Sequence, residues 1–241
     1  DPAQRELHLA NANSITNHGF SWQVIEPSPG IWNFGPADAT HAFATDNDLT
    51  ETGLHFAWGQ DALDDLPDWV EEITDPDELR AALTNRAQVI FDRYPDLDRI
   101  DVVNEPFDLL GGALYRNHFY DVLGPDYIAE LFDIVAAHAP ATTELIINEN
   151  LVEYFPAKAE ALLDLARDLK SRGKRLDGVG LQSHLFLGEP DWDLYRRVMD
   201  ELAAMDLTVL ITELDAPTAP SEPNPEQAQA DRSRTATAPC P

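Results

Sequence analysis

Arg99-Ile100-Asp101-Val102-Val103-Asn104-Glu105 is a short β-rich run that ends on a polar pair, and similar runs recur along the chain between longer helical patterns. Strands that alternate with helices in this way predict parallel strands joined by crossover helices. The expected strands span 13–16, 52–58, 99–104, 144–148, 178–183 and 208–213, and the expected helices lie near 37–47, 76–93, 124–138, 156–172 and 191–204.

The number of strands and the composition of the C-terminal stretch set the expected architecture. A closed barrel of this class has eight strands, whereas the sequence offers six. From Ala216 onward the chain is rich in Pro, Ala, Thr, Ser, Glu and Gln, a composition typical of a linker or a disordered end. We therefore expect an α/β fold, a (β/α)₈ TIM barrel that is incomplete because its first and last strands are missing, over residues 1–216. A disordered or linker-like tail is expected over residues 217–241.

The chain is strongly acidic, with 44 Asp and Glu residues against 16 Lys and Arg residues and a net charge of −28. Such a surface repels nucleic acid and anionic membranes, so neither is expected as a partner. Two explanations of the acidity stay open. The protein is either an ordinary acidic secreted protein, or it is adapted to high salt, where screening removes the self-repulsion.

Other sequence features limit the function classes. We find no phosphate loop and no clustered ligand spacing, so no metal and no cofactor are expected. No stretch approaches the roughly 18 apolar residues of a membrane-spanning helix. The one cysteine, Cys240, lies in the tail, which argues against an internal disulfide framework. The chain opens without a starting Met or an apolar run, so we expect a mature or truncated product. We also expect the protein to be secreted or extracellular, and to be a monomer.

Two acids stand at the ends of predicted strands: Glu105 follows Asn104, and Glu213 follows the run Val209-Leu210-Ile211-Thr212. In parallel barrels the reactive groups collect at the carboxyl ends of the strands. Glycoside hydrolysis needs two carboxyl groups beside one bond, one to protonate the leaving oxygen and one to attack or to activate water. One such acid is more often a cap or a surface ion pair, so the hypothesis depends on the pair.

Longer motifs accompany the two acids. Val102-Val103-Asn104-Glu105 and Thr212-Glu213-Leu214-Asp215 resemble the Val-Val-Asn-Glu and Thr-Glu-Leu-Asp motifs of glycoside hydrolase family 10, the endo-1,4-β-xylanase family. The resemblance covers about residues 14–216 in family order. The other matching stretches are 25–34 with Ala37-Asp38, 66–70, 145–150 and 177–185.

This resemblance implies a role for each matching residue. Glu105 would be the acid/base, and Glu213 would be the nucleophile that forms a covalent glycosyl-enzyme. Asn104 would hydrogen-bond the sugar 2-hydroxyl. His184, with Asp215 behind it, would keep Glu213 ionised and oriented.

Further polar and aromatic residues would line the same site. Gln182 and Asn148 would give polar support, although both could equally satisfy backbone groups at strand ends. Trp58 ends a predicted strand at the catalytic face and is the best candidate for stacking on a sugar, whereas Trp22 and Trp69 fit core packing better.

Three sugar-binding features of the family are absent. Its Glu-Asn-x-x-Lys before a Trp is replaced here by Asn17-His18-Gly19-Phe20-Ser21-Trp22, and its Trp-His after strand three is replaced by Trp58-Gly59. The Trp that the family contributes after strand eight has no counterpart.

The leading hypothesis is a retaining endo-β-1,4-glycanase, a xylanase that acts on a β-1,4-linked polysaccharide such as xylan. The alternatives are a catalytically weak, carbohydrate-binding pseudoenzyme and an inactive barrel fragment. The four residues Glu105, Glu213, His184 and Asp215 favour an enzyme, while the lost sugar contacts and missing strands favour the alternatives.

The net charge of −28 leads to a first prediction. Salt shortens the screening length from about 10 Å at 0.1 M to about 3 Å at 1 M, which removes repulsion between surface carboxylates. If the protein is adapted to high salt, its melting temperature should climb steeply between these two concentrations. A flat curve, measured by calorimetry at constant pH, would show that the acidity is ordinary.

Overall fold

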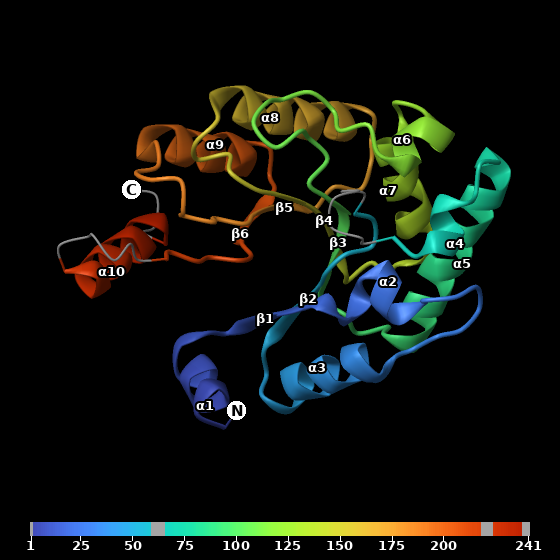
Figure 1. Ribbon diagram of the computed structural model, residues 1–241, viewed down its shortest axis with the longest axis horizontal. Helices are drawn as coiled ribbons and strands as arrows, with labels where there is room; N and C mark the ends of the chain where they lie inside the picture. The colour runs from blue at the N-terminus through green and yellow to red at the C-terminus, as the bar shows by residue number, and fades with distance from the viewer. Residues whose placement is uncertain (1, 59–65, 218–223, 238–241) are drawn as a thin grey trace. The chain divides into compact units, whose positions relative to one another are not determined.

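The computed structural model describes residues 2–58, 66–217 and 224–237, so Cys240 lies outside the described residues. The chain divides into two compact units (Figure 1). The first unit contains Asp1–Asn104 and Arg116–Leu145, and the second contains Glu105–Tyr115 and Ile146–Pro241. Each unit is described in turn.

The first unit holds three parallel strands. Ser14 of β1 lies opposite Thr50 of β2, and Thr52 of β2 lies opposite Arg99 of β3. The strands are β1 (Ser14–Asn17), β2 (Thr50–Gly53) and β3 (Arg99–Asn104), and the helices are α1 (Pro2–Asn11), η1 (His18–Phe20), α2 (Trp22–Ile25), α3 (Gly35–Asp46), α4 (Asp68–Glu71), α5 (Pro76–Arg93), α6 (His118–Leu123) and α7 (Tyr127–His138).

The second unit repeats this pattern of strand and helix. Ile146 of β4 lies opposite Gly178 of β5, which in turn lies opposite Thr208 of β6, and both pairings are parallel. The elements are β4 (Glu144–Glu149, whose first two residues belong to the first unit), α8 (Pro156–Ser171), β5 (Gly178–Leu181), α9 (Trp192–Ala204), β6 (Thr208–Ile211) and α10 (Pro225–Ala236).

Six parallel strands that alternate with helices make up a partial (β/α)₈ barrel, as the sequence predicts. Each expected strand and each expected helix is present among the described residues, with ends that differ by a few residues. Among those residues, β1 is the outer strand of the first unit and β6 is the outer strand of the second.

The helices begin where the sequence marks their starts. In α5 the Asp75 side chain accepts hydrogen bonds from the backbone N–H groups of Asp77 and Glu78, at 2.8 and 3.1 Å, and Pro76 occupies the first turn. The apolar residues of α7 then show the helical spacing of a buried face, with Tyr127, Leu131 and Val135 buried on it.

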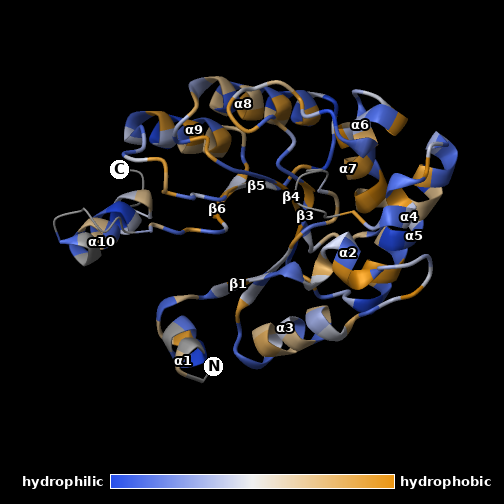
Figure 2. Ribbon diagram, in the orientation of Figure 1, coloured by the Kyte–Doolittle hydropathy of each residue, from blue (hydrophilic) through white to orange (hydrophobic). Residues whose placement is uncertain are grey.

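The C-terminal stretch differs from the expectation of a disordered tail. Residues 225–236 form α10, which Figure 2 shows to be mostly hydrophilic. The Ala, Gln and Arg residues of α10 favour a helix although the segment has little apolar content. Pro225 suits the first turn of a helix. Ala236 is buried in a small cluster with Leu185 and Ala216. Low apolar content therefore predicted the absence of a strand but not the absence of a helix.

A buried arginine ties α5 to the strand ends of the first unit. Arg86 is fully buried, and its guanidinium donates to the carbonyls of Phe56, at 3.2 Å, and of His55, at 3.1 Å, and also to that of Phe20. The same group lies 4.8 Å from the centre of the Trp22 ring. Carbonyls that no strand satisfies thus find their donors in one side chain.

Replacing this arginine tests its role in stability. Arg86→Met keeps an unbranched apolar stem but leaves buried carbonyls without a donor, so the free energy of unfolding should fall by about 3 kcal/mol or more. Arg80→Met is the matched control, because Arg80 lies on the same helix, is 40% exposed and pairs only with carboxylates of Asp77 and Glu130 among its described salt bridges. That control should lose much less stability than Arg86→Met in denaturant titrations, because exposed ion pairs contribute little. Equal losses in the two variants would contradict this account.

Candidate active site

The two predicted catalytic acids lie in the second unit, at the carboxyl ends of strands. Glu105 follows β3 directly, and its backbone is left-handed, with φ of 50°. Its N–H donates to the carbonyl of Asn148 at 2.8 Å. Glu213 lies two residues after β6, and its N–H donates to the carbonyl of Gln182 at 3.1 Å. Each acid is thus fixed through its backbone to a neighbouring strand end.

Two amide side chains hold the carboxylates. Gln182 Nε2 donates to Glu105 Oε1 at 2.9 Å, and Asn148 Nδ2 donates to Glu213 Oε1 at 2.7 Å. The Thr212 hydroxyl donates to Asn148 Oδ1 at 2.7 Å, which fixes the orientation of that amide. The structure therefore brings four of the predicted residues together, and Gln182 and Asn148 hydrogen-bond the acids themselves.

A glycine makes room for this arrangement. A Cβ on Gly180 would lie 2.4 Å from Asn148 Oδ1 and 2.8 Å from Thr212 Cγ2. Only glycine lets β5 pass this close to the amide that holds Glu213. The sequence placed Gly180 in a strand without showing why a glycine is needed there.

His184 connects the second acid to Asp215. Its Nε2 lies 3.5 Å from Glu213 Oε2, and its Nδ1 lies 3.1 Å from Asp215 Oδ2, although the latter contact lacks the alignment of a hydrogen bond. Contact with the Glu213 carboxylate, assisted by the charge of Asp215, raises the pKa of His184 from 6.5 to about 9, against the effect of partial burial. At neutral pH the imidazole is therefore a cation beside Glu213, which favours the ionised carboxylate.

Asn104 and Trp58 belong to the first unit. They face each other in a parallel bridge, and the N–H of Asn104 donates to the carbonyl of Ala57 at 2.9 Å. Asn104 is almost fully buried, and the peptide bond joins it to Glu105. The Trp58 ring is half-buried, and its centre lies 4.8 Å from that of His55.

The other two tryptophans have the roles that the sequence analysis favoured. Trp22 is buried in the core, where its ring meets that of Trp69 edge to face at 5.8 Å. The indole N–H of Trp69 donates to the carbonyl of Glu26 at 3.2 Å.

Asn17, which lies in the segment that replaces the family's Glu-Asn-x-x-Lys, makes its side-chain hydrogen bonds within the first unit. Asn17 is buried, and its side chain donates to the Glu51 carboxylate at 2.6 Å and to the Ala37 carbonyl at 3.0 Å. Glu51 in turn lies 2.6 Å from His41. This asparagine is therefore a structural residue.

Sequence reasoning missed three buried charged residues of the second unit. Glu149, Glu153 and Lys158 are all fully buried. Burial raises the pKa of Glu149 to about 7 against the opposing charge of Lys158, and it raises the pKa of Glu153 to about 7 as well. Lys158 stands four residues before Leu162 and eight before Ala166, on the apolar stripe of α8, and that spacing was the available signal.

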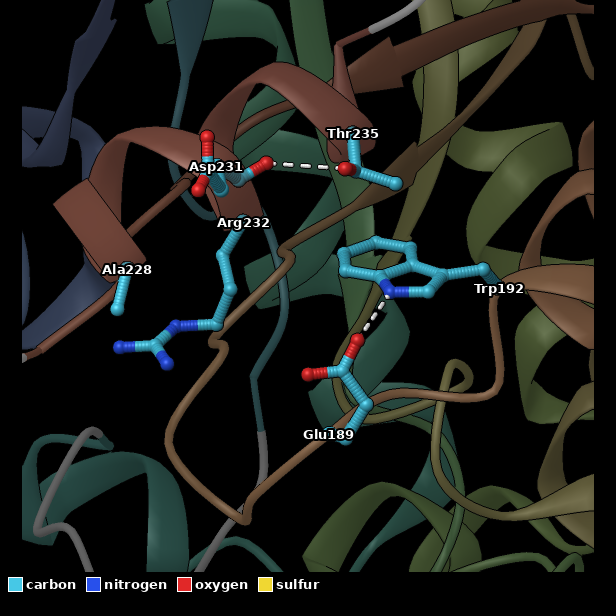
Figure 3. Close-up of a pocket in the computed structure, with 6 residues that line it drawn as sticks. All are labelled: Glu189, Trp192, Ala228, Asp231, Arg232 and Thr235. Carbon is cyan, nitrogen blue, oxygen red and sulfur yellow. Dashed lines mark hydrogen bonds between the residues drawn. The ribbon is translucent and has the colours of Figure 1, made fainter. Parts of the chain in front are cut away.

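A cavity of about 300 Å³ lies beside α10 and shares no residue with the site described above (Figure 3). Its polar walls pair with one another: the Trp192 indole N–H donates to Glu189 at 2.7 Å, and the Thr235 hydroxyl donates to the Asp231 carbonyl at 2.9 Å. The lining residues are Glu189, Trp192, Ala228, Asp231, Arg232 and Thr235.

Searches of the described residues for other kinds of site gave two negative findings. Within them, no group of three or more His, Cys, Asp or Glu side chains is arranged to hold a metal ion. No helix among residues 2–58, 66–217 and 224–237 is long and apolar enough to cross a membrane.

A partial (β/α)₈ barrel with two carboxylates at its strand ends defines the class of a barrel glycoside hydrolase. The sequence model of glycosyl hydrolase family 10 matches residues 1–240. The chain belongs to this family.

Relatives with known names agree with this assignment. Endo-1,4-beta-xylanase C of Phanerodontia chrysosporium is 32% identical over 218 residues, which cover 89% of this chain and 52% of the relative. Endo-1,4-beta-xylanase A of Halalkalibacterium halodurans is 30% identical, with coverage of 83% and 54%. The chain therefore spans about half the length of these relatives.

Solved structures show the same likeness. Native xylanase 10B from Thermotoga maritima is 26% identical with a TM-score of 0.87, over 97% of this chain and 72% of that one. Xylanase 10B from Thermotoga petrophila, in complex with xylobiose, is 26% identical with a TM-score of 0.88, over 97% and 71%.

The raised pKa of His184 gives a prediction with a definite sign. Protonation of His184 stabilises the folded state, so its contribution is complete below about pH 6.5 and is lost as the pH rises through about 9. Asp215→Asn should lower this pKa, as read from the imidazole signals in an NMR titration. The variant should melt below the parent at pH 6 and level with it at pH 10. The exposed Asp193→Asn is the control and should leave the His184 titration unchanged.

Proposed function

We propose that this chain is the catalytic part of a retaining endo-β-1,4-xylanase, with Glu105 as acid/base and Glu213 as nucleophile. One observation carries the proposal: Gln182 hydrogen-bonds both acids, through its side chain to Glu105 and through its carbonyl to the N–H of Glu213. Two carboxyl groups fixed to one residue suit a reaction that needs both beside one bond. In a retaining enzyme we expect them to lie about 5–5.5 Å apart.

In the first step the Glu213 carboxylate attacks the anomeric carbon. The bond from that carbon to the glycosidic oxygen breaks with its electron pair, and Glu105 gives its proton to the leaving oxygen. The products are a glycosyl ester on Glu213 and a shortened chain with a free hydroxyl.

In the second step water takes the place of the departed chain. Glu105, now ionised, removes a proton from the water. The water oxygen attacks the anomeric carbon at the same time, and the ester bond to Glu213 breaks. Two displacements at one carbon give net retention of configuration.

The surrounding residues prepare Glu213 for attack. Asn148 donates to Oε1 and leaves Oε2 beside the protonated His184, so the carboxylate is ionised and its orientation is fixed. Asn104 would hydrogen-bond the sugar 2-hydroxyl, and Trp58 would stack on a sugar ring. Both assignments follow from the family resemblance and await a complex with substrate.

The names of the relatives support xylan as the substrate, and one of the similar structures is a complex with xylobiose. We also infer that the protein is secreted, because an intact polysaccharide does not cross a membrane. The side chain of Asn17 is hydrogen-bonded to Glu51. We therefore expect this chain to bind the non-reducing side of the substrate more weakly than relatives that have the Glu and the Lys of the Glu-Asn-x-x-Lys motif.

Three variants test the roles of the acids. Glu213→Gln keeps the shape but removes the nucleophile, so release of reducing sugar from xylan should fall by about 10⁴-fold or more. Glu105→Ala should fall by about 10²–10⁴-fold, and azide should restore part of its rate on substrates with good leaving groups. Glu160→Gln, an acid on the surface of α8, is the control and should keep the parent rate.

The stereochemistry and the binding of xylan separate the alternatives. Proton NMR of the first product should show the β-anomer, and an α-anomer would refute the retaining mechanism. If the parent binds xylan in calorimetry but releases no sugar, the chain is a carbohydrate-binding pseudoenzyme. If it neither binds nor cleaves, the xylanase proposal is wrong for this chain.

A further inference from the structure

The turn that carries Glu105 needs external support. A non-glycine residue at φ of 50° occupies a sparsely populated region and persists only where its surroundings impose it. Two hydrogen bonds from the turn reach β4: Glu105 N–H donates to the Asn148 carbonyl at 2.8 Å, and Phe107 N–H donates to Glu149 Oε2 at 3.3 Å. The second of these depends on a side chain, so it can be removed without changing the strand.

The Glu149 carboxylate is held by a buried cation. Lys158 Nζ lies 2.8 Å from Oε1, the N–H of Asn150 donates to the same oxygen at 2.8 Å, and Lys158 also donates to the Asn150 side chain. Both members of the ion pair are fully buried. The other charged groups that act on this pair are the carboxyls of Glu105 and Glu153.

The ion pair favours the ionised, acceptor form of Glu149. Burial alone favours the protonated carboxyl, and Lys158 opposes that tendency by charge and by hydrogen bonding. An ionised carboxylate has only acceptor positions, so its Oε2 remains available to the N–H of Phe107.

We propose that the buried Glu149–Lys158 ion pair is a positioning device for the acid/base: it fixes the left-handed turn and thereby aims the Glu105 carboxyl at the leaving oxygen. This inference rests on the proposed function of Glu105. Neither residue of the pair touches substrate, so both act through the turn.

Substrates with different leaving groups separate positioning from general damage. Cleavage of xylohexaose expels a shorter xylo-oligosaccharide whose leaving oxygen needs a proton from Glu105, whereas 2,4-dinitrophenyl β-xylobioside releases a phenolate that needs none. In Lys158→Met and Glu149→Gln, kcat/KM on xylohexaose should fall by about 10–10²-fold, part of the usual contribution of a general acid. On the aryl substrate kcat/KM should stay within about threefold of the parent.

A paired substitution keeps the test independent of stability. Glu149→Met with Lys158→Met removes both charges, so it avoids the unpaired buried ion of the single variants and should melt closer to the parent. It still lacks the acceptor for Phe107, and we expect it to stay defective on xylohexaose alone. Glu149→Asp keeps the charge and should recover most of the lost rate. Lys170→Met, on the exposed side of α8, is the control.

Amide hydrogen exchange gives a readout that needs no turnover. The N–H of Phe107 should exchange at least about tenfold faster in the paired variant, while that of Val179 in β5 should not change. Equal losses on the two substrates, or an unchanged Phe107 amide, would overturn the positioning role. If the parent cleaves neither substrate, the proposed function fails, and the Phe107 amide alone still decides whether the ion pair holds the turn.

Discussion

In the second unit, the placement of the two acids depends on the hydrogen bonds of Asn148. Its carbonyl accepts from the N–H of Glu105, its amide donates to Glu213, and its Oδ1 accepts from Thr212. One residue on β4 thus connects the turn after β3 with the strand end after β6. Because the amide must lie against β5, Gly180 has to lack a side chain. Because Asn148 binds Oε1 of Glu213, the other carboxylate oxygen, Oε2, lies beside His184.

The chain has few cations, and two of them are inside. Arg86 satisfies backbone carbonyls in the first unit, and Lys158 pairs with Glu149 in the second. Burial of an ion is unfavourable unless its partners are fixed. Arg86 connects α5 to carbonyls 30 and 31 residues earlier in the chain, whereas Lys158 connects α8 to the nearby end of β4. The interior also holds the carboxyl groups of Glu26, Glu51, Asp101, Glu149 and Glu153, so burial of the two cations does not make the exterior more acidic than the net charge of −28. This arrangement is compatible with both explanations of the acidity.

The site and the sugar-binding surroundings have diverged to different extents. The acids, their amide partners and the His184–Asp215 pair are all present with short contacts. The segment around Asn17, in contrast, has become part of the interior of the first unit through Glu51. A side chain that satisfies a buried carboxylate cannot also bind a sugar. We therefore propose that this divergence affects binding of the substrate more than the chemistry proposed for the two acids.

The sequence by itself determined the strands, the helices α3, α5, α7, α8 and α9, and the six polar residues from Glu105 to Asp215 that gather in the second unit. Hydrophobic periodicity and short motifs are local properties, so they can be read without coordinates. Only the tertiary structure decided that Arg86 and Lys158 are interior residues and that residues 225–236 form a helix. The place of a buried charge depends on partners in other elements, such as the carbonyl of Phe56 for Arg86 and the carboxylate of Glu149 for Lys158. Such partners come into contact only when the strands and helices pack, and the sequence pattern alone does not predict these contacts.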